Sequence, residues 1–407
     1  MDLTALLTGA FLLLSALGFD TVMHPRDIVL EAHKASQLGT VSLTDTMLNA
    51  VMKAQVEEIF LTKSVVTKPT IRLSNQKGIG VTITDAIGLS AVANALQEQM
   101  GYRPDRIELH VFKENEITKV LVSGYHARQN GMFEQEVVQV KDERIVSLVQ
   151  RATAVAMATI DPYVTALNLM RRHIRDRDFS QSEAVIAYAK ARLRSTTVNP
   201  ERAMLENLEG MIALFRHDSP RARERFQTAV ASDPGNQVAA LNLALVLLEE
   251  DLDARVAAMM ADMLQQNPPV DPVLLATVHM TQAAAFLGLR QPVPADVAMA
   301  KAAALNPTSP TILNAWAEVK TQMGHKAAAE TLNQQARSAE NTFDDYAEVA
   351  ALYFTLAWQK GEPVLRSPFD NIGTSPDTAD KTAPTAPETA TKTEPVKEPV
   401  PEAPTTR

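Results

Sequence analysis

Four prolines recur at a nearly constant spacing in the second half of the chain, and this period limits the possible folds more than any other feature. The spacings are 34, 34 and 39 residues, between Pro200, Pro234, Pro268 and Pro307, and each proline closes a helical run rich in Ala and Leu. A unit of this length cannot bury its own apolar face, so it must stack on a neighbouring copy. The spacing therefore predicts a mainly α fold, a solenoid of helical hairpins, in preference to an ordinary helical bundle.

The repeat that ends at Pro234 carries small and aromatic residues where two helices must pack closely. Gly210 lies in its first helix, and Ala222 and Phe226 follow at helical spacing in its second. These are signature positions of the tetratricopeptide repeat (TPR), and the chain resembles that family over about residues 163–340. The resemblance implies a superhelical array that binds other proteins. The other matching positions are Ala184, Tyr188, Ala191, Ala229, Ala244, Met260, Leu264, Ala283, Phe286, Ala295, Ala302, Gly324, Ala329 and Ala336.

Residues 40–160 predict a small α+β domain ahead of the array, although no stretch of them matches a named family. β-branched runs indicate strands, and Asn130-Gly131 favours a tight hairpin because both residues tolerate positive φ. Ser42 with Asp45 forms a capping-box-like start for a helix. The predicted helices are 26–38, 42–61, 85–100 and 142–160, and the predicted strands are 65–73, 79–84, 107–112, 117–125 and 133–140.

Residues 1–22 indicate a transmembrane or signal-anchor helix. Residues 3–19 contain no charged side chain, and seventeen residues rise about 25 Å as a helix, which is within the range of short membrane spans. One alternative is a cleaved signal peptide with a small-residue site at 16–18, but the basic segment that usually precedes the apolar region is missing. A start upstream of residue 1 is a third possibility. Arg26 and Lys34 follow the span, so the positive-inside rule favours a cytoplasmic body.

A membrane span, a small domain and TPR helices in this order resemble the layout of bacterial envelope proteins and membrane-bound regulators. The resemblance implies a single-pass protein of the bacterial inner membrane. A predicted capping helix at 343–358 completes an array over 163–362, and the composition then changes. The last forty residues contain eight prolines and nine threonines. Such a segment buries little apolar surface, so residues 366–407, rich in Pro, Thr, Glu and Ala, are predicted to be disordered.

The sequence contains no local motif for catalysis, a metal or a cofactor, so none of these is predicted. The chain has no cysteine, and its eight histidines are dispersed, which leaves no metal-ligand spacing. Gly78 and Gly80 lack the third glycine of a dinucleotide fingerprint. Ser123-Gly124 lacks the upstream glycine of a nucleophile elbow. The formal net charge of -9 argues against general nucleic-acid binding.

Together these patterns predict a membrane-anchored TPR scaffold or adaptor that binds another protein through an apolar superhelical groove. In a TPR array the first helix of each repeat lines this groove. The acidic run 249–253 adjoins it, which favours an apolar partner segment with basic flanks. The predicted partner-binding residues are Met204, Asn207, Met211, Leu241, Leu245, Leu248 and Met280.

Two alternatives stay open. In one, the groove residues are covered by the neighbouring repeat or by the α+β domain. In the other, the chain is a signalling or ligand-sensing protein in which the α+β domain binds a ligand and the repeats relay it. Capture of an acidic tail is not expected, because Asn207 and Asn314 alone are available to read a carboxylate in the groove. The basic run at 171–177 is interpreted as a solvated helix face.

Overall fold

The computed structural model describes residues 26–35, 44–66, 71–73, 105–127, 131–193, 198–338 and 346–350. All of them belong to the larger of two compact units, Met1–Ile372, whereas the second unit, Gly373–Arg407, lies outside the described residues. Among the described helices, none is long and apolar enough to cross a membrane. The sequence predictions that also fall outside the described residues are the membrane helix at 1–22, the strand at 79–84, the helix at 85–100 and the disordered segment at 366–407.

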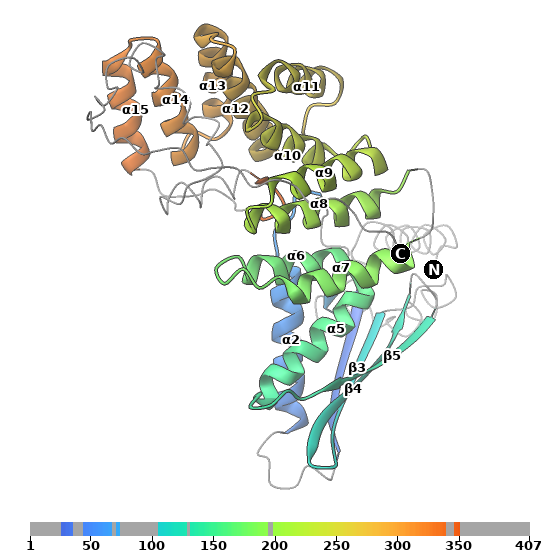
Figure 1. Cartoon of the computed structure of the whole chain (residues 1–407). Helices are drawn as coiled ribbons and strands as arrows, with labels where there is room; N and C mark the ends of the chain where they lie inside the picture. Colours follow the sequence, from blue (N-terminus) through green and yellow to red (C-terminus); the bar gives the residue numbers. More distant parts are fainter. Residues whose placement is uncertain are drawn as a thin grey trace, which may run out of the picture. The chain divides into compact units, whose positions relative to one another are not determined.

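Five of the described segments are strands of one sheet, in the order β2-β1-β3-β4-β5. β1 runs parallel to β2 and β3, whereas β3, β4 and β5 are antiparallel neighbours. Helices α2 and α5 pack against the sheet (Figure 1). The bounds are β1 Arg26–Lys34, α2 Asp45–Phe60, β2 Ile71–Leu73, β3 Asp105–Glu114, β4 Ile117–His126, β5 Gly131–Val138 and α5 Ile145–Ile160.

Strand β1 corrects the sequence analysis, which predicted a helix at 26–38 and began the α+β domain at residue 40. Ile28 and Ala32 are fully buried, and their spacing of four residues fits both the helical and the strand period. The strand is favoured because residues distant in sequence form hydrogen bonds with its main-chain N–H and C=O groups. β3 pairs along one edge, and the carboxamide of Asn49 in α2 bonds to the N–H and the C=O of Ala32 at 2.9 and 3.0 Å.

The hairpins of the sheet differ from the one predicted. Asn115 and Glu116 join β3 to β4 with φ angles of 47° and 67°, and positive φ at both central residues is characteristic of a type I′ turn. Gly131 pairs with His126 as the first residue of β5, so Asn130-Gly131 is not the tight turn that the sequence predicted. Glu116 takes a position that glycine normally fills, which explains why turn chemistry did not reveal this hairpin.

Polar side chains set the helix boundaries on the way into the array. The Thr44 hydroxyl accepts a first-turn N–H at 3.2 Å and starts α2, two residues after the predicted Ser42. The N–H of Asp161 bonds to the carbonyl of Met157 at 2.7 Å and ends α5. The Asp161 carboxylate then accepts the N–H of Val164 at 3.2 Å in the first turn of α6. A single residue therefore joins the α+β domain to the array.

Within residues 162–338, as far as they are described, five helical hairpins follow α5 and form a TPR-like solenoid in which each helix packs on the next. Asn, Asp or Ser side chains cap the first helices of the last four hairpins, as expected for N-termini. Pro200 opens a helix at a position that tolerates proline, instead of closing one. The hairpins are α6 Pro162–Arg172 with α7 Ser180–Arg192, α8 Pro200–Phe215 with α9 Ser219–Ser232, α10 Gln237–Leu248 with α11 Asp253–Gln266, α12 Pro272–Gly288 with α13 Pro292–Leu305, and α14 Pro310–Gln322 with α15 Lys326–Ser338.

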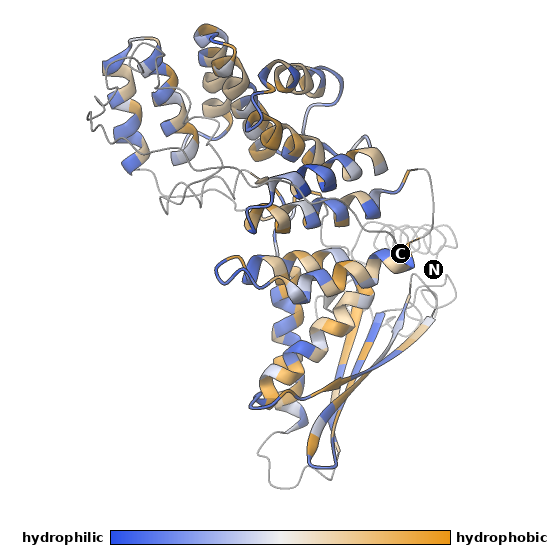
Figure 2. Ribbon diagram, in the orientation of Figure 1, coloured by the Kyte–Doolittle hydropathy of each residue, from blue (hydrophilic) through white to orange (hydrophobic). Residues whose placement is uncertain are grey.

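Close packing within a hairpin depends on a small residue that faces an aromatic ring. Gly210 of α8 lies against the ring of Phe226 in α9, and a Cβ atom on Gly210 would approach that ring to 2.4 Å. Ala222 and Ala229 of α9 are fully buried as well. α10, the first helix of its hairpin, is more apolar than α9, the second helix of the preceding hairpin (Figure 2). The predicted role of Gly210 is confirmed.

Gly210→Ala is expected to destabilise the chain by about 1–3 kcal/mol, because the added methyl group has no space beside the Phe226 ring. Gly235→Ala is the matched control, since the nearest atom to its Cβ would be Asp233 Oδ1 at 3.2 Å. Urea unfolding of the two variants and the parent chain measures the difference. Equal stability of the two variants would contradict the packing described here.

The turn after α10 contains a poorly solvated carboxyl group. Glu249 Oε2 accepts a hydrogen bond from the Ser219 hydroxyl at 3.1 Å, while Glu249 Oε1 is buried without a hydrogen-bond partner among the described residues. Burial raises the pKa of Glu249 to about 7, the bond from Ser219 opposes this rise, and the charge of Glu250 adds to it. Glu250 itself is exposed and pairs with Arg223 at 2.7 Å.

Stability is therefore expected to fall as the pH rises from 4.5 to about 7, the ordinary and the folded-state pKa of Glu249. Below this window the carboxyl group is protonated in the folded and the unfolded chain, and above it only the folded chain holds the ionised group in a poorly solvated place. Glu249→Gln should raise the free energy of unfolding at about pH 8 by about 1–3 kcal/mol. Urea unfolding at about pH 4 and pH 8 checks this. Glu250→Gln serves as the control, and an equal gain from it would contradict the assignment.

Candidate functional site: a segment-binding face of the helical array

A short stretch that follows the array, Tyr346–Ala350, lies on the face formed by α8, α10 and the start of α12 (Figure 1). We call this stretch the docked segment and this face the first-helix face, because α8, α10 and α12 are the first helices of their hairpins. Residues 347–350 each expose 5% of their surface or less. Residues 346–349 are not helical, so the predicted capping helix at 343–358 is wrong there. The rest of that prediction, apart from Ala350, lies outside the described residues.

Two asparagines of the first-helix face hold the main chain of the docked segment. Asn207 of α8 and Asn242 of α10 both donate their side-chain N–H groups to the carbonyl oxygen of Glu348, at 3.0 and 2.8 Å. The Asn242 oxygen accepts the N–H of Ala350 at 2.8 Å, and its amide also donates to Asn207 Oδ1 at 2.8 Å. Because these bonds reach only the main chain, the same pair can hold segments of different sequence.

The side chain of Glu348 enters a pocket that we call the carboxyl pocket, formed by residues 64–66 and Tyr163. Glu348 Oε1 accepts hydrogen bonds from the Ser64 hydroxyl at 3.0 Å and from the N–H groups of Val65 and Val66 at 2.5 and 3.3 Å. The Tyr163 hydroxyl donates to Oε2. Residues 64–66 follow α2, and Tyr163 lies in the first turn of α6. The pocket is therefore built jointly by the α+β domain and the array.

The donors of the carboxyl pocket carry no charge, and this affects the pKa values of Glu348 and Tyr163. Burial raises the pKa of Glu348, although the hydrogen bonds from Tyr163, Val65, Ser64 and Val66 all act to lower it. Burial, followed by the charge of Glu348, raises the pKa of Tyr163, so the phenol remains a donor. Four donors satisfy the two carboxyl oxygens, which is what a buried carboxyl group requires.

A third contact extends the site toward α12. The Tyr346 hydroxyl donates to Asp271 Oδ2 at 3.2 Å. The other oxygen of Asp271 accepts the N–H groups of Val273 and Leu274 at 2.9 and 3.0 Å and so caps α12. The docked segment therefore contacts α6, α8, α10 and the N-terminus of α12 over five residues.

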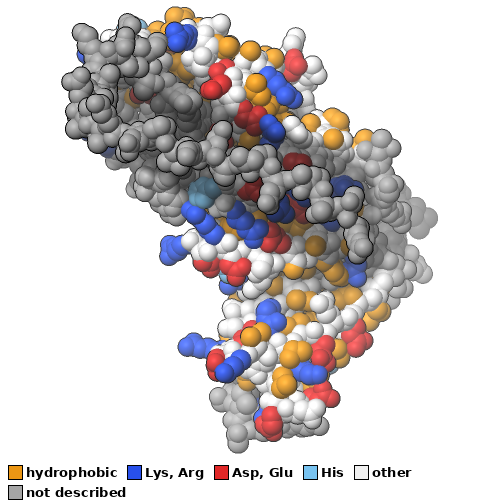
Figure 3. Space-filling view, viewed as in Figure 1, with side chains coloured by type: hydrophobic (Ala, Val, Ile, Leu, Met, Phe, Trp, Pro, Cys, Tyr) orange, Lys and Arg blue, Asp and Glu red, His pale blue; other side chains and the backbone are white. Residues whose placement is uncertain are grey.

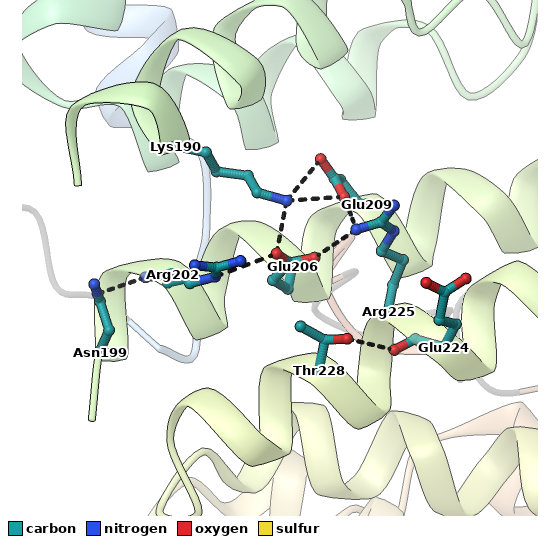
Figure 4. A network of polar contacts seen from close by, with 8 residues as sticks. All are labelled: Lys190, Asn199, Arg202, Glu206, Glu209, Glu224, Arg225 and Thr228. Carbon is teal, nitrogen blue, oxygen red and sulfur yellow. Dashed lines mark hydrogen bonds and ion pairs between the residues drawn. The ribbon is translucent and has the colours of Figure 1, made fainter. Parts of the chain in front are cut away.

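An ionic network holds α8 between its neighbours (Figure 4). The Glu206 side chain, which is 1% exposed, binds Lys190 of α7 at 2.7 Å and Arg225 of α9 at 3.1 Å. Glu209 binds the same two cations, each at 3.2 Å. Burial acts to raise the pKa of Glu206, but the bonds from Lys190 and Arg225 outweigh burial and the pKa is lowered. Because Glu206 precedes Asn207, the network also fixes the orientation of the helix that carries Asn207.

The basic run at 171–177 lies away from this site, at the turn between α6 and α7. Arg171, Arg172, Arg175 and Arg177 are exposed there. In Figure 3, Lys and Arg side chains gather across the middle of the view, with acidic side chains among them. Arg172 lies 3.6 Å from Glu58 of α2. The exposure agrees with a solvated surface.

The residues predicted to bind a partner occupy different environments on the first-helix face. Asn207 contacts the docked segment directly, and the Met211 sulfur lies 3.7 Å from the Asn242 amide. Met204 is partly buried. The remaining predicted residues are apolar and expose 6% or less of their surface, namely Leu241, Leu245, Leu248 and Met280.

Six residues whose side chains form the site were not predicted from the sequence: Ser64, Tyr163, Asn242, Asp271, Tyr346 and Glu348. Asn242 had a usable signal, because it is the polar residue in the middle of an otherwise apolar helix and a buried amide requires a partner. Ser64 and Tyr163 had none, since the sequence does not indicate that the end of α2 meets the start of α6. Among the described residues there is also no group of three or more potential metal ligands.

No family model matches the chain, and neither does any curated protein. Among solved structures, similar chains are TPR-repeat proteins. A structure of PilF from Pseudomonas aeruginosa is 14% identical, covers 49% of this chain and 92% of its own length, and has a TM-score of 0.38. MamA AMB-1 is 16% identical over 44% of this chain and 98% of its own, with a TM-score of 0.34. At these values the TPR-like assignment rests on the hairpins and the helix packing described above.

Asn242→Ala is expected to lower the free energy of unfolding by about 1–3 kcal/mol, because it leaves the Ala350 N–H and the Asn207 oxygen without their partners. It should also speed amide hydrogen exchange within residues 346–350. Asn314→Ala is the control, since Asn314 lies on a first helix, α14, and no described contact joins it to the docked segment. Urea unfolding and hydrogen exchange read by mass spectrometry check both effects. Unchanged exchange at 346–350 would contradict the role of Asn242.

Proposed function

We propose that the chain is a TPR-type scaffold that binds a short, turn-forming segment of another protein on its first-helix face. The supporting observation is the pairing of Asn207 and Asn242 with the main chain of the docked segment. An array that holds five residues of its own chain in this way has the donors, the acceptor and the apolar surroundings that a partner segment needs. The small side chains of Ala347, Val349 and Ala350 fit the prediction of an apolar partner.

The finer parts of this proposal come from the sequence. The uncharged run at 3–19 supports a membrane anchor, and the resemblance in layout supports the bacterial inner membrane. Arg26 and Lys34, which follow the run, favour a soluble part on the cytoplasmic side. The acidic run 249–253 supports basic residues on the flanks of the partner segment. The proposed activity is binding, and no catalytic step is assigned to the chain.

A second candidate function is a ligand-sensing protein whose α+β domain signals through the repeats. The observation in its favour is that the carboxyl pocket combines residues 64–66 of the α+β domain with Tyr163 of the array. A change in the α+β domain at that point would alter how the docked segment is held. The scaffold is preferred because its contacts with a protein segment are all present in one site.

The scaffold is tested with a chain whose own segment has been expelled. Val349→Asp introduces a charge at a side chain that is 5% exposed, and the cost of burying an unpaired charge should drive the segment out. We call this full-length variant the released chain. A fluorescent peptide of residues 344–352 should bind the released chain, and the same peptide should bind at least about tenfold more weakly after Asn242→Ala, a loss of about 1.4 kcal/mol.

Fluorescence anisotropy measures this binding, and Asn314→Ala in the released chain is the matched control. Hydrogen exchange at residues 346–350 verifies that the segment has left the face. The scaffold proposal is overturned if the peptide does not bind the released chain, or if Asn242→Ala and Asn314→Ala have the same effect.

A further inference from the structure

The carboxyl pocket is a recognition feature that a general peptide-binding face does not require. The two asparagines already satisfy the main chain at Glu348 and Ala350. The pocket adds four donors that converge on one side chain. Without a carboxyl group in the pocket, the N–H of Val65 and the hydroxyl of Tyr163 would lose the bonds described here, whereas the N–H of Val66 would keep its bond to the Ser64 oxygen at 3.1 Å. A site with such donors discriminates strongly against a segment that cannot fill them.

We propose that the partner is a turn-forming protein segment with a glutamate between small apolar residues, and that the chain's own docked segment, in which the Val349 N–H bonds to the Tyr346 carbonyl at 3.0 Å, occupies its site until that partner displaces it. This proposal rests on the scaffold function proposed above and specifies its partner. It also revises the expectation that an acidic segment is not captured here. That expectation counted converging cations, whereas the pocket uses hydroxyl and main-chain N–H donors.

The length of the glutamate side chain matters because both of its ends are fixed. At one end Asn207 and Asn242 hold the carbonyl of Glu348, and at the other end the pocket holds its carboxyl group. Aspartate is shorter by one methylene group, so an aspartate held by the same asparagines places its oxygens short of the donors. Alanine leaves the pocket empty. The geometry therefore favours glutamate over both residues.

The neighbours of the glutamate must be small. Ala347 is 1% exposed, Val349 is 5% exposed and Ala350 is fully buried, so the face leaves little space for longer side chains at these positions. The N–H of Ala350 bonds to Asn242, which excludes proline two residues after the glutamate. Together these constraints describe a partner segment of the form small–Glu–small–small, without proline at the last position.

The docked segment meets this description and is part of the same chain. Because it is tethered, its binding to the face is intramolecular, and a partner in solution competes against an effective local concentration. A partner therefore competes successfully only if it binds more tightly, or makes a second contact elsewhere. The docked segment thus sets a threshold for binding. Displacement also releases Ser64 and Tyr163 from a shared ligand, so it alters the contact between the α+β domain and the array.

The test uses the released chain and three fluorescent peptides of residues 344–352, with glutamate, aspartate or alanine at position 348. The glutamate peptide should bind at least about tenfold more tightly than the other two by anisotropy. Ser64→Ala with Tyr163→Phe in the released chain should weaken this preference, because the two hydroxyl donors are lost and the N–H groups of Val65 and Val66 remain, while leaving the alanine peptide unaffected. Asn314→Ala should leave all three affinities unchanged.

Competition by the docked segment is tested with the unmodified full chain. The glutamate peptide should bind to it at least about tenfold more weakly than to the released chain, because the docked segment occupies the same site.

The outcomes separate this proposal from the scaffold function. If the three peptides bind equally and their binding still requires Asn242, the scaffold stands and the selection of glutamate is overturned. If no peptide binds, the scaffold itself fails and this proposal fails with it. If the glutamate peptide binds the unmodified chain and the released chain equally tightly, the docked segment does not compete with it. The proposal that a partner displaces the docked segment is then overturned.

Hydrogen exchange in the unmodified chain provides a measurement that does not depend on the released chain. If the docked segment is displaceable, the amides of 349 and 350 should exchange faster than those of α10, at a rate that added glutamate peptide increases. Glu348→Ala should speed this exchange at least about tenfold, and Glu330→Ala, at an exposed glutamate of α15, should not. Exchange of 349 and 350 only together with α10 would show that the segment is a fixed part of the core, and would overturn the proposal.

Discussion

Asn242 is completely buried in a helix whose other inward residues are apolar, and the requirement to satisfy its amide determines much of the surrounding structure. An exposed side-chain amide can form hydrogen bonds to water, but a buried one must find its partners within the protein. Asn207 supplies one of them, and the main chain at 348 and 350 supplies the others. The apolar face around Asn242 therefore has a polar centre, and this centre matches one carbonyl and one N–H of a main-chain turn.

Three buried or half-buried glutamates show how differently the array treats a carboxyl group. Glu206 has two cations within 3.1 Å, which offset its burial and lower its pKa. Glu348 has four uncharged donors and a raised pKa. Glu249 has one hydroxyl and a pKa of about 7. The series follows the number and charge of the partners, as desolvation arguments require. It distinguishes a charged network, a pocket of uncharged donors and a poorly solvated turn.

The repeats were predictable from sequence because their signal is local and recurs. Gly210 and Phe226 lie 16 residues apart in one hairpin, and their steric match is visible in the residue types. Features that depend on distant partners were not predictable. β1 needs β3 and Asn49, and its apolar spacing fits a helix equally well. The docked segment needs Asn207, Asn242 and Ser64, which lie 141, 106 and 284 residues away from their contacts in it. Asn207 was recognised as a candidate, but the neutral carboxyl pocket was not, because a search for paired charges overlooks hydroxyl and main-chain donors.

The contact of Glu348 with Ser64 and Tyr163 has a consequence for folding. A solenoid normally behaves as a one-dimensional chain of units, in which terminal repeats fray independently and folding starts anywhere. Here the segment after the last repeat bonds back to Ser64, which precedes the first repeat, and to Tyr163 at the start of the first repeat, 284 and 185 positions earlier. Loss of one repeat therefore weakens a contact shared by the whole array, which couples the repeats into a more cooperative unit. Such closure also requires contacts at very large sequence separation, which form late and slow the final step of folding.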